Sequence, residues 1–337
     1  MKQKIFLLVL ILIASIGISA FYIFSNKIKN QRNLVVESNP KNIKKSDKPV
    51  VYMTKELTSD GLIAVHKDPG LILSGKIAVK IGTGEPDGNN YISSDLIKEL
   101  VQSVNGTLVE CNTAYKGKRS NSKQHKKVAE DHGFTAIAPV DIMDEEGFVS
   151  LPFEKGENIK ENYVGSHFKN YESYIILSHF KGHRMGGFGG AIKNMSVGIA
   201  SANGKMWINT AGLTDNTSDF SKAFETPQDK FLESMAEAAG AVMLYLGDKI
   251  LYISVMNKLS VDCDCMSNPA APTMKDIGIL ASIDPVALDQ ACVDLIYKVH
   301  DGHDLIKRME EKNGIHTLEH AEKLGLGSRT YELVIIE

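Results

Sequence analysis

The residues that decide the fold are Tyr-Ile-Ile-Leu-Ser-His-Phe-Lys-Gly-His-Arg-Met-Gly-Gly-Phe-Gly-Gly-Ala-Ile-Lys-Asn, from Tyr174 to Asn194. The first four, Tyr174 to Leu177, predict a buried strand because they form a short apolar run. The run from Ala191 to Ala200 predicts a helix, since its apolar residues are ones that a helix could largely bury. The glycines between the two runs are therefore expected at a strand-to-helix turn.

This turn has the composition of a ligand site. Glycines let backbone N–H groups come close to a ligand, and the start of a helix favours an anion such as phosphate or carboxylate. Lys181, Arg184 and Lys193 would supply positive charge. The spacing matches neither the P-loop nor the dinucleotide fingerprint. The ligand-binding residues predicted here are Gly186, Gly187, Gly189, Gly190, Lys193 and Asn194.

Two histidines and a lysine in the same turn are the candidate catalytic residues: His179, His183 and Lys181. The histidines could act as acid/base groups or as metal ligands. Gly182 lies between them and no Glu follows the first, which argues against the helical zinc-peptidase motif. The alternative is that one histidine fills a turn while the other is exposed.

Apolar and amphipathic runs alternate along the rest of the chain. This order predicts an α/β domain over residues 49–337, with a mixed or mostly parallel sheet covered by helices on both faces. The expected runs are Lys76–Ile81, Ser94–Val104, Thr107–Cys111, Gln124–His132, Ala136–Ile142, Gln228–Leu246, Lys249–Val255, Ile277–Ala281, Pro285–His300 and Tyr331–Ile336. Asp284 and Pro285 mark one helix start, because Asp suits the N-cap and Pro the first helical position.

Two further loops follow predicted strands. One begins after Cys111 and is polar and basic, and the other runs from Lys80 to Gly88. Strand carboxyl ends form the ligand crevice in open α/β sheets, so both loops are expected to meet the loop that carries His179. The residues predicted to bind ligand from the first loop are Asn112, Thr113 and Lys116, with Tyr115 and Arg119 beside them.

The segment Asp262-Cys-Asp-Cys265 alternates carboxylates and thiols. Alternation would put the thiols on one face, where they could bind a metal or undergo redox chemistry. Two Cys ligands are too few for a closed Cys-only zinc or iron–sulfur site, and a disulfide between them is possible. A surface loop with inert thiols is the alternative. The candidate metal ligands are Cys263, Cys265, Asp262 and Asp264.

The N-terminus predicts a membrane segment. Ile5 to Phe24 is an apolar run long enough to cross a hydrocarbon core, so residues 1–25 are expected to be an anchor, or else a signal peptide. Residues 26–48 are rich in Asn, Lys and Ser and predict a solvated tether. Basic residues flank the run on both sides. The short basic start favours a globular part outside the cytoplasm, and the cytoplasmic orientation is the alternative.

Composition adds one exclusion. The 337-residue chain has a net charge of −3 and is 43% hydrophobic, with basic residues scattered among acidic ones. Nucleic acid is therefore not expected as a partner.

Several motifs in this order resemble the DUF362 family. They are Val79-Lys-Ile-Gly-Thr-Gly-Glu-Pro86, Asn112-Thr-Ala-Tyr-Lys-Gly117, His132-Gly-Phe134, Ser178-His-Phe-Lys-Gly-His183, Gly187-Phe-Gly-Gly-Ala-Ile-Lys-Asn194, Asp262-Cys-Asp-Cys265, and Asp276-Ile-Gly-Ile-Leu-Ala-Ser282 with Asp284-Pro-Val286. Many members of that family are described as iron–sulfur centre proteins. Where such relatives carry a ferredoxin-like insert, this chain has Ala200–Gln228, which contains no cysteine. Ferredoxin-type 4Fe–4S clusters are therefore not expected.

Two functions remain from the sequence. The first is a membrane-tethered domain that binds an anionic small molecule and could also use a metal ion or a redox-active thiol pair. In it, Lys181 and Lys193 hold the anion. The second is a tethered extracytoplasmic protein that binds a ligand or scaffolds a partner without turnover.

Overall fold

A computed structural model of the chain describes residues 48–266 and 268–336. The predicted anchor and, apart from Lys48, the predicted tether lie outside the described residues. Among the helices that are described, none is both long enough and apolar enough to cross a membrane.

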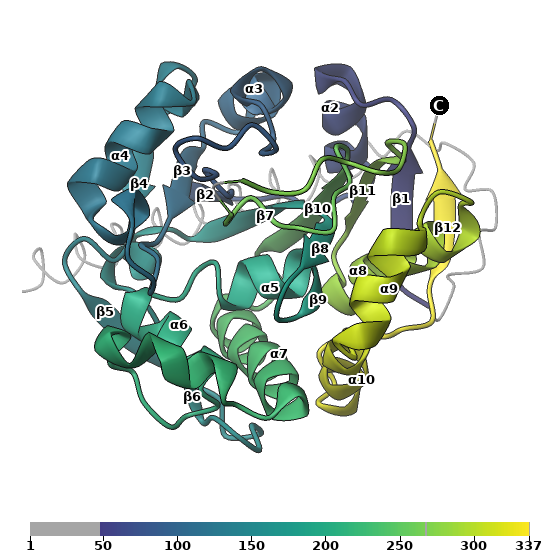
Figure 1. The fold of residues 1–337 in the computed structure, drawn as a ribbon. Helices are drawn as coiled ribbons and strands as arrows, with labels where there is room; N and C mark the ends of the chain where they lie inside the picture. Colours follow the sequence, from purple (N-terminus) through teal and green to yellow (C-terminus); the bar gives the residue numbers. More distant parts are fainter. Residues whose placement is uncertain (1–47, 267, 337) are drawn as a thin grey trace, which may run out of the picture. The chain divides into compact units, whose positions relative to one another are not determined.

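An eight-stranded sheet forms the centre of the domain (Figure 1), in the order β12-β1-β11-β10-β7-β2-β3-β4. The strands are β1 Val50–Thr54, β2 Ile77–Lys80, β3 Thr107–Glu110, β4 Val140–Ile142, β7 Ser173–His179, β10 Ile250–Met256, β11 Gly278–Ser282 and β12 Glu332–Ile335. Strand β11 pairs antiparallel with β1 and β10, and the other neighbours in this sheet pair parallel. The predicted mixed, mostly parallel sheet is confirmed.

Helices cover both faces of this sheet, as predicted (Figure 1). One face carries α2 Ser59–Lys67, α3 Ser94–Ser103 and α4 Ser122–Asp131. The other carries α5 Ala191–Ser196, α7 Gln228–Leu246, α8 Pro285–Lys298 and α10 His316–Lys323, with α6 Ala202–Asn209 and α9 His303–Glu311 beside them. The remaining elements are the hairpins β5 Phe148–Pro152 with β6 Glu161–Gly165 and β8 Lys181–His183 with β9 Gly187–Gly189, and the 3-10 helices η1 Lys118–Ser120, η2 Phe134–Ala136, η3 Ser166–Asn170 and η4 Thr217–Phe224.

Strand β7 shows why the central strands read as continuous apolar runs. Tyr174 and Ile176 belong to the core that also contains α5, α7 and α8 residues, whereas Ile175 and Leu177 belong to the core under α2 and α3. Successive side chains point to opposite faces of a strand, and here both faces are covered. Alternate residues of β7 therefore supply apolar side chains to the two cores, and Tyr174–Leu177 is apolar throughout.

Two local predictions near the ends of helices have different outcomes. The helix start at Asp284 is confirmed, because Asp284 Oδ1 accepts hydrogen bonds of 2.9 Å from the N–H groups of Val286 and Ala287. The helix predicted over Ala191–Ala200 is too long, since α5 ends at Ser196. The chain leaves the helix there to form a bridge between Ala200 and Val164 of β6.

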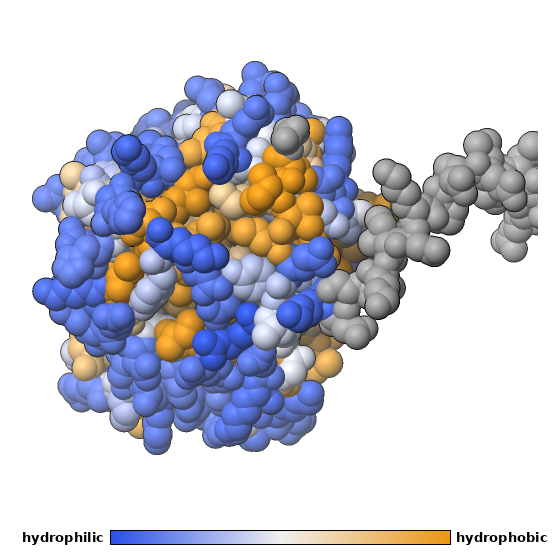
Figure 2. Space-filling view, turned by 90° about the vertical axis from the view of Figure 1, so that its right-hand side faces the viewer, coloured by the Kyte–Doolittle hydropathy of each residue, from blue (hydrophilic) through white to orange (hydrophobic). Residues whose placement is uncertain are grey.

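The side of the domain at which β12 lies carries an apolar area surrounded by hydrophilic surface (Figure 2). Ile335 of β12 is one of the large apolar side chains that are exposed in the described chain.

Candidate functional site

The carboxyl ends of four parallel strands meet at one edge of the sheet. Strands β10, β7, β2 and β3 are neighbours, and β2 and β3 end in the charged residues Lys80 and Glu110. A cavity of about 340 Å³ lies at this edge. Its walls come from the loops after these strands, from α5, α6, η4 and α7, and from residues 263–266. The edge is where ligands bind in open α/β sheets.

The structure brings most of the predicted site residues to this cavity. Those that line it are His179, Lys181, His183, Gly189, Gly190, Lys193, Asn194, Thr113, Cys263, Asp264 and Cys265. Those that do not line it are Gly186, Gly187, Asn112, Lys116 and Asp262. Lys116 is exposed, and Asn112 donates to Ser122 Oγ (2.8 Å) and Asp144 Oδ1 (3.0 Å) instead.

The glycine-rich turn differs from the predicted anion-binding helix start. Its glycines form the β8–β9 hairpin before α5 begins. The first N–H groups of α5, those of Ala191 and Ile192, donate to the two carboxylate oxygens of Asp289, at 2.7 and 2.9 Å. A carboxylate of the chain itself therefore takes the place that an external anion was expected to occupy.

Buried charges at the floor of the cavity are paired. Lys80 Nζ donates to Glu110 Oε2 (3.1 Å) and to Asn194 Oδ1 (3.0 Å). Burial alone would raise the pKa of Glu110, but nearby positive charge, above all that of Lys80, lowers it to about 2. Asn194 also donates to the Leu177 carbonyl (3.1 Å). Asn194 thus ties α5 to the strand ends, a structural role beside its predicted ligand contact.

Arg119 and Glu85 form a second buried ion pair in the wall of the cavity, next to Glu110. Arg119 donates to Glu85 Oε1 through Nε (2.9 Å) and Nη2 (2.7 Å). Tyr115 donates to the same oxygen (2.7 Å), and its hydroxyl lies 3.3 Å from the Cys265 carbonyl oxygen. Burial, together with the Glu85 carboxylate, raises the pKa of Tyr115, so its hydroxyl stays protonated. The Glu85 N–H donates to the Asp264 carbonyl (3.0 Å), which links this pair to the cysteine segment.

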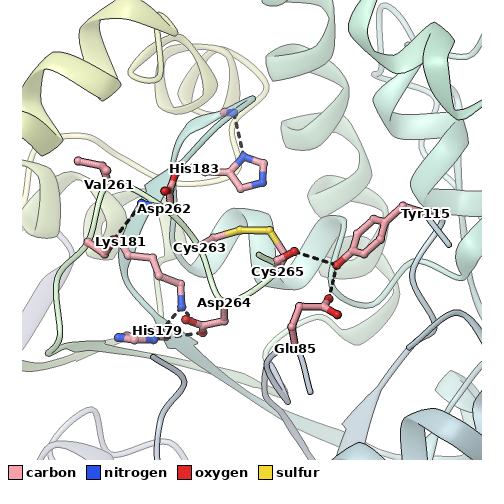
Figure 3. The surroundings of a disulfide bond; sticks show 12 residues. Glu85, Tyr115, His179, Lys181, His183, Val261, Asp262, Cys263, Asp264 and Cys265 are labelled. Carbon is pink, nitrogen blue, oxygen red and sulfur yellow. Dashed lines mark hydrogen bonds and ion pairs between the residues drawn. A yellow bond between two sulfur atoms is a disulfide. The ribbon is translucent and has the colours of Figure 1, made fainter. Parts of the chain in front are cut away.

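Two of the predicted catalytic residues are also engaged (Figure 3). Lys181 forms an ion pair with Asp264, and its Nζ lies 2.7 Å from His179 Nδ1. The other ring nitrogen of His179 lies 2.6 Å from the Asn257 carbonyl oxygen, to which it must donate. In that tautomer Nδ1 carries no proton and accepts a hydrogen bond from the Lys181 ammonium group. His179 therefore has no free nitrogen with which to act as a general base in this arrangement.

Lys193 is different from the other lysines of the site. Its Nζ makes no hydrogen bond or ion pair with any residue that the structure describes, although it faces the cavity. Burial, and then the positive charges of Lys181, Lys80 and Lys205, lower its pKa to about 8. At neutral pH most of its amino groups are still charged. Lys193 is thus a cation that is partly removed from water and whose ammonium group can still donate hydrogen bonds to a ligand.

Positive charge is in excess around the cavity. In the described chain six cationic side chains line it, against the two carboxylates of Glu110 and Asp264. The cations are Lys80, Arg119, Lys181, Arg184, Lys193 and Lys205. Glu85 adds a third carboxylate through its bond to Arg119. Three positive charges therefore remain without a carboxylate to balance them.

Cys263 and Cys265 form a disulfide at the wall of the cavity (Figure 3). The ligand atoms of His183, Cys263 and Cys265 all lie within 4.8 Å of one another. His183 Nδ1 accepts from the Gly186 N–H (2.9 Å), and burial lowers the pKa of His183 well below its usual value. The imidazole is therefore neutral with its proton on Nε2.

The two aspartates of the cysteine segment turn away from the sulfur atoms. Asp262 Oδ1 lies 3.3 Å from Arg308 Nη1, and its Oδ2 accepts from the Ala270 N–H (3.1 Å). Asp264 pairs with Lys181, and its Oδ2 lies 3.1 Å from His179 Nδ1. The group that could hold a metal therefore combines the two cysteines with His183, in place of the two predicted carboxylates.

Gly182 explains how His183 and the cysteines come together. A Cβ atom at Gly182 would collide with the backbone of Val261, and the Gly182 N–H donates to the Ser260 carbonyl (2.8 Å). Only glycine allows strand β8 to approach the cysteine segment this closely.

Residues 77–294 match the family described as "Domain of unknown function (DUF362)". This chain belongs to the DUF362 family. The match spans the strands β2 to β11 and every DUF362 motif that borders the cavity, so the resemblance found in the sequence is confirmed. The family description assigns no reaction.

Two solved structures are similar at low levels. The lactate racemase apoprotein from Thermoanaerobacterium thermosaccharolyticum has a TM-score of 0.37 and 14% identity, covering 60% of this chain and 50% of that one. A Thermotoga maritima protein has a TM-score of 0.38 and 13% identity, covering 79% of this chain and 58% of that one. This chain thus spans only half to three-fifths of their length, and similarity at this level transfers no activity. A search of curated proteins found no match.

Several residues at the cavity were not among the predicted site residues. Lys80 and Glu110 had a usable signal, because charged residues are almost never fully buried unless paired and each ends a short apolar strand. Lys205 had none. It enters the cavity from α6 and donates to the Ala200 carbonyl (2.6 Å), a placement that depends on the packing of α6.

Proposed function

We propose that this domain binds an anionic small molecule in the cavity at the carboxyl edge of the sheet, with Lys193 as the group that meets the anion. The observation that supports this most strongly is the unpaired Lys193 within an excess of positive charge. A bound anion would give Lys193 the partner that the described chain does not offer it. Hydrogen bonds between an ammonium group and an anion are shorter and stronger than those between neutral groups.

Titration calorimetry with inorganic phosphate tests this function. Lys193→Met should weaken phosphate binding by about 10- to 100-fold, since hydrogen bonds to charged groups contribute about 1.5–3 kcal/mol. Lys116→Met is the matched control, because Lys116 is exposed and lies outside the cavity. Equal affinities in the two variants would remove Lys193 from the proposal.

Binding without turnover is the form of this function that the geometry favours. His179 has both ring nitrogens engaged and Lys181 is paired with Asp264, so neither predicted catalytic group is free to move a proton. His183 is neutral and its Nδ1 is occupied. A product that accumulates in proportion to enzyme from any bound anion would overturn this reading.

A metal ion held by the reduced cysteine pair is the second candidate. Two thiolates and an imidazole are three of the four ligands that zinc takes, which leaves one position open toward the cavity. Binding through His183 Nε2 requires that the bond from Gly186 to Nδ1 be exchanged, because the second ring nitrogen would then carry the proton.

Metal analysis of the reduced, anaerobically purified protein tests the second candidate. One zinc ion per chain is expected, with loss in Cys263→Ser/Cys265→Ser and retention in Asp262→Asn. Two reactive thiols in a metal-free protein would rule it out.

We also propose that the apolar run Ile5–Phe24 anchors the domain to a membrane, with the globular part outside the cytoplasm. Arginine at the centre of such a segment costs about 2.5–3.5 kcal/mol each. Leu12→Arg/Ile16→Arg should therefore release the protein from carbonate-washed membranes, whereas Asn30→Arg should not. Equal retention of both variants would contradict the anchor.

A further inference from the structure

One wall of the anion cavity is apolar. Its residues come from η4, from the start of α7, from the β8–β9 loop, from the end of α5 and from the cysteine segment: Phe220, Phe224, Phe231, Met185, Val197 and Met266. The same cavity thus has a cationic floor and an apolar side. An inorganic anion would use only the floor.

Phe220 and Phe224 form a row of aromatic rings that starts at the charged part of the site. The Phe220 ring lies 5.9 Å from the Tyr115 ring and 5.7 Å from the Phe224 ring, both in edge-to-face arrangements. Tyr115 in turn bonds to Glu85 and Arg119. A body attached to an anion at the floor would therefore lie along aromatic surface.

Phe224 keeps apolar surface in contact with water. Its side chain is 70% exposed, although it borders a cavity. Covering aromatic surface stabilises a complex by roughly 25 cal/mol for each Å² removed from water. The cavity volume of about 340 Å³ is at the lower end of the range for sites that hold drug-sized ligands, and is larger than a phosphate or acetate ion needs.

We infer that the ligand is an amphipathic anion, with one carboxylate or phosphate group at Lys193 and an aromatic or branched aliphatic body against Phe220, Phe224 and Phe231. This inference rests on the proposed anion site and adds the chemical class of the ligand. The anionic group sets the orientation, and the apolar body supplies the contact area.

Two matched pairs of probes test the class: phosphate against phenyl phosphate, and acetate against phenylacetate. The aromatic member of each pair should bind about tenfold more tightly or better, since a ring adds buried apolar area and ring–ring contacts. Comparison of the two pairs also shows which anionic group the floor prefers.

Variants separate this inference from the function on which it rests. Phe224→Ser should reduce the aromatic advantage several-fold without affecting binding of the parent anion or folding, because the side chain is largely exposed. Phe220→Ala should reduce it further. Phe148→Ala is the control, as Phe148 is a partly exposed aromatic residue of β5 that does not line the cavity.

Each outcome has a definite meaning. If phosphate and phenyl phosphate bind equally and both are lost in Lys193→Met, the anion site stands and the amphipathic ligand is wrong. If none of the four probes binds, the proposed function itself fails. An aromatic advantage that survives unchanged in Phe224→Ser and Phe220→Ala would also overturn the inference.

Discussion

Two regions of this domain carry charged groups away from bulk water but satisfy them to different degrees. On α7, Glu237 is 0% exposed and accepts from the N–H groups of Glu157 (2.8 Å), Asn158 (3.1 Å) and Ile159 (2.8 Å), and His320 Nε2 lies 3.0 Å away. At the cavity, by contrast, Lys193 is partly buried and has no such partner in the described chain.

The difference separates a structural cluster from a site. A closed network rigidifies the fold, because each buried polar atom has its partner. The cavity network is open, since Lys193 lacks a partner and Asp264 Oδ1 has no hydrogen bond within the part of the chain that the structure describes. Burial of charge is therefore a poor guide to function by itself, and the missing partner is the informative feature.

Removing the centre of the closed cluster should have the largest effect. Glu237→Ala leaves three backbone N–H groups without their acceptor, so the free energy of unfolding should fall by about 3–5 kcal/mol. Urea denaturation measures this. Glu233→Ala, on the same helix but partly exposed, should cost about 1 kcal/mol and serves as the control. Equal losses in the two variants would show that Glu237 is not the centre of this cluster.

Protonation of Glu110 in acid should weaken its ion pair with Lys80 at the floor of the cavity and so lower the free energy of unfolding. The pKa of Glu110 is lowered to about 2 in the folded protein from a usual value of 4.5, so its contribution is fully present above about pH 4.5 and is lost as the pH falls toward 2. The contribution should be on the order of 3 kcal/mol. In Glu110→Gln the unfolding free energy should drop at neutral pH and depend less steeply on pH between 4.5 and 2.

Unfolding curves recorded from pH 5 down to pH 2 check this prediction. Glu145→Gln is a suitable control, because Glu145 forms an exposed ion pair with Lys126. A pH dependence in Glu110→Gln as steep as that of the unchanged protein would show that Glu110 does not titrate as described.

The smallest effect should have the opposite sign. Burial and neighbouring lysines lower the pKa of Lys193 to about 8, so its charge destabilises the fold at pH 7 and this penalty disappears as the pH rises. Lys193→Met should raise the free energy of unfolding by about 1–2 kcal/mol while it weakens anion binding. A loss of stability in this variant would show that Lys193 has a structural partner.

Much of the fold was predictable because its signals are local. The Tyr174–Leu177 strand and the Asp284-Pro285 helix start depend on neighbouring residues alone, and helix α7 has the predicted bounds Gln228–Leu246. The β8–β9 hairpin was not predicted, because each of its strands has three residues and contains glycine, so no periodicity identifies it.

The site was predictable in location but less so in its contacts. The rule that strand carboxyl ends converge brings together the loops after β2, β3 and β7, as the sequence analysis expected. The partner of each charge was not predictable. Asp289 accepts from the Ile192 N–H of α5, which is 97 residues away in sequence, and Lys80 of β2 pairs with Glu110 of the neighbouring strand β3. Such pairings depend on tertiary packing.

The most direct test of the account is the pKa of the Lys193 amino group, measured by NMR on ¹⁵N-lysine-labelled protein and assigned with Lys193→Arg. Without an added anion the account predicts a pKa of about 8. With saturating phosphate or phenyl phosphate the pKa should rise toward its usual value of 10.5, because the bound anion stabilises the charged form. A pKa that stays the same when either anion is added would contradict the claim that Lys193 is the anion-binding group.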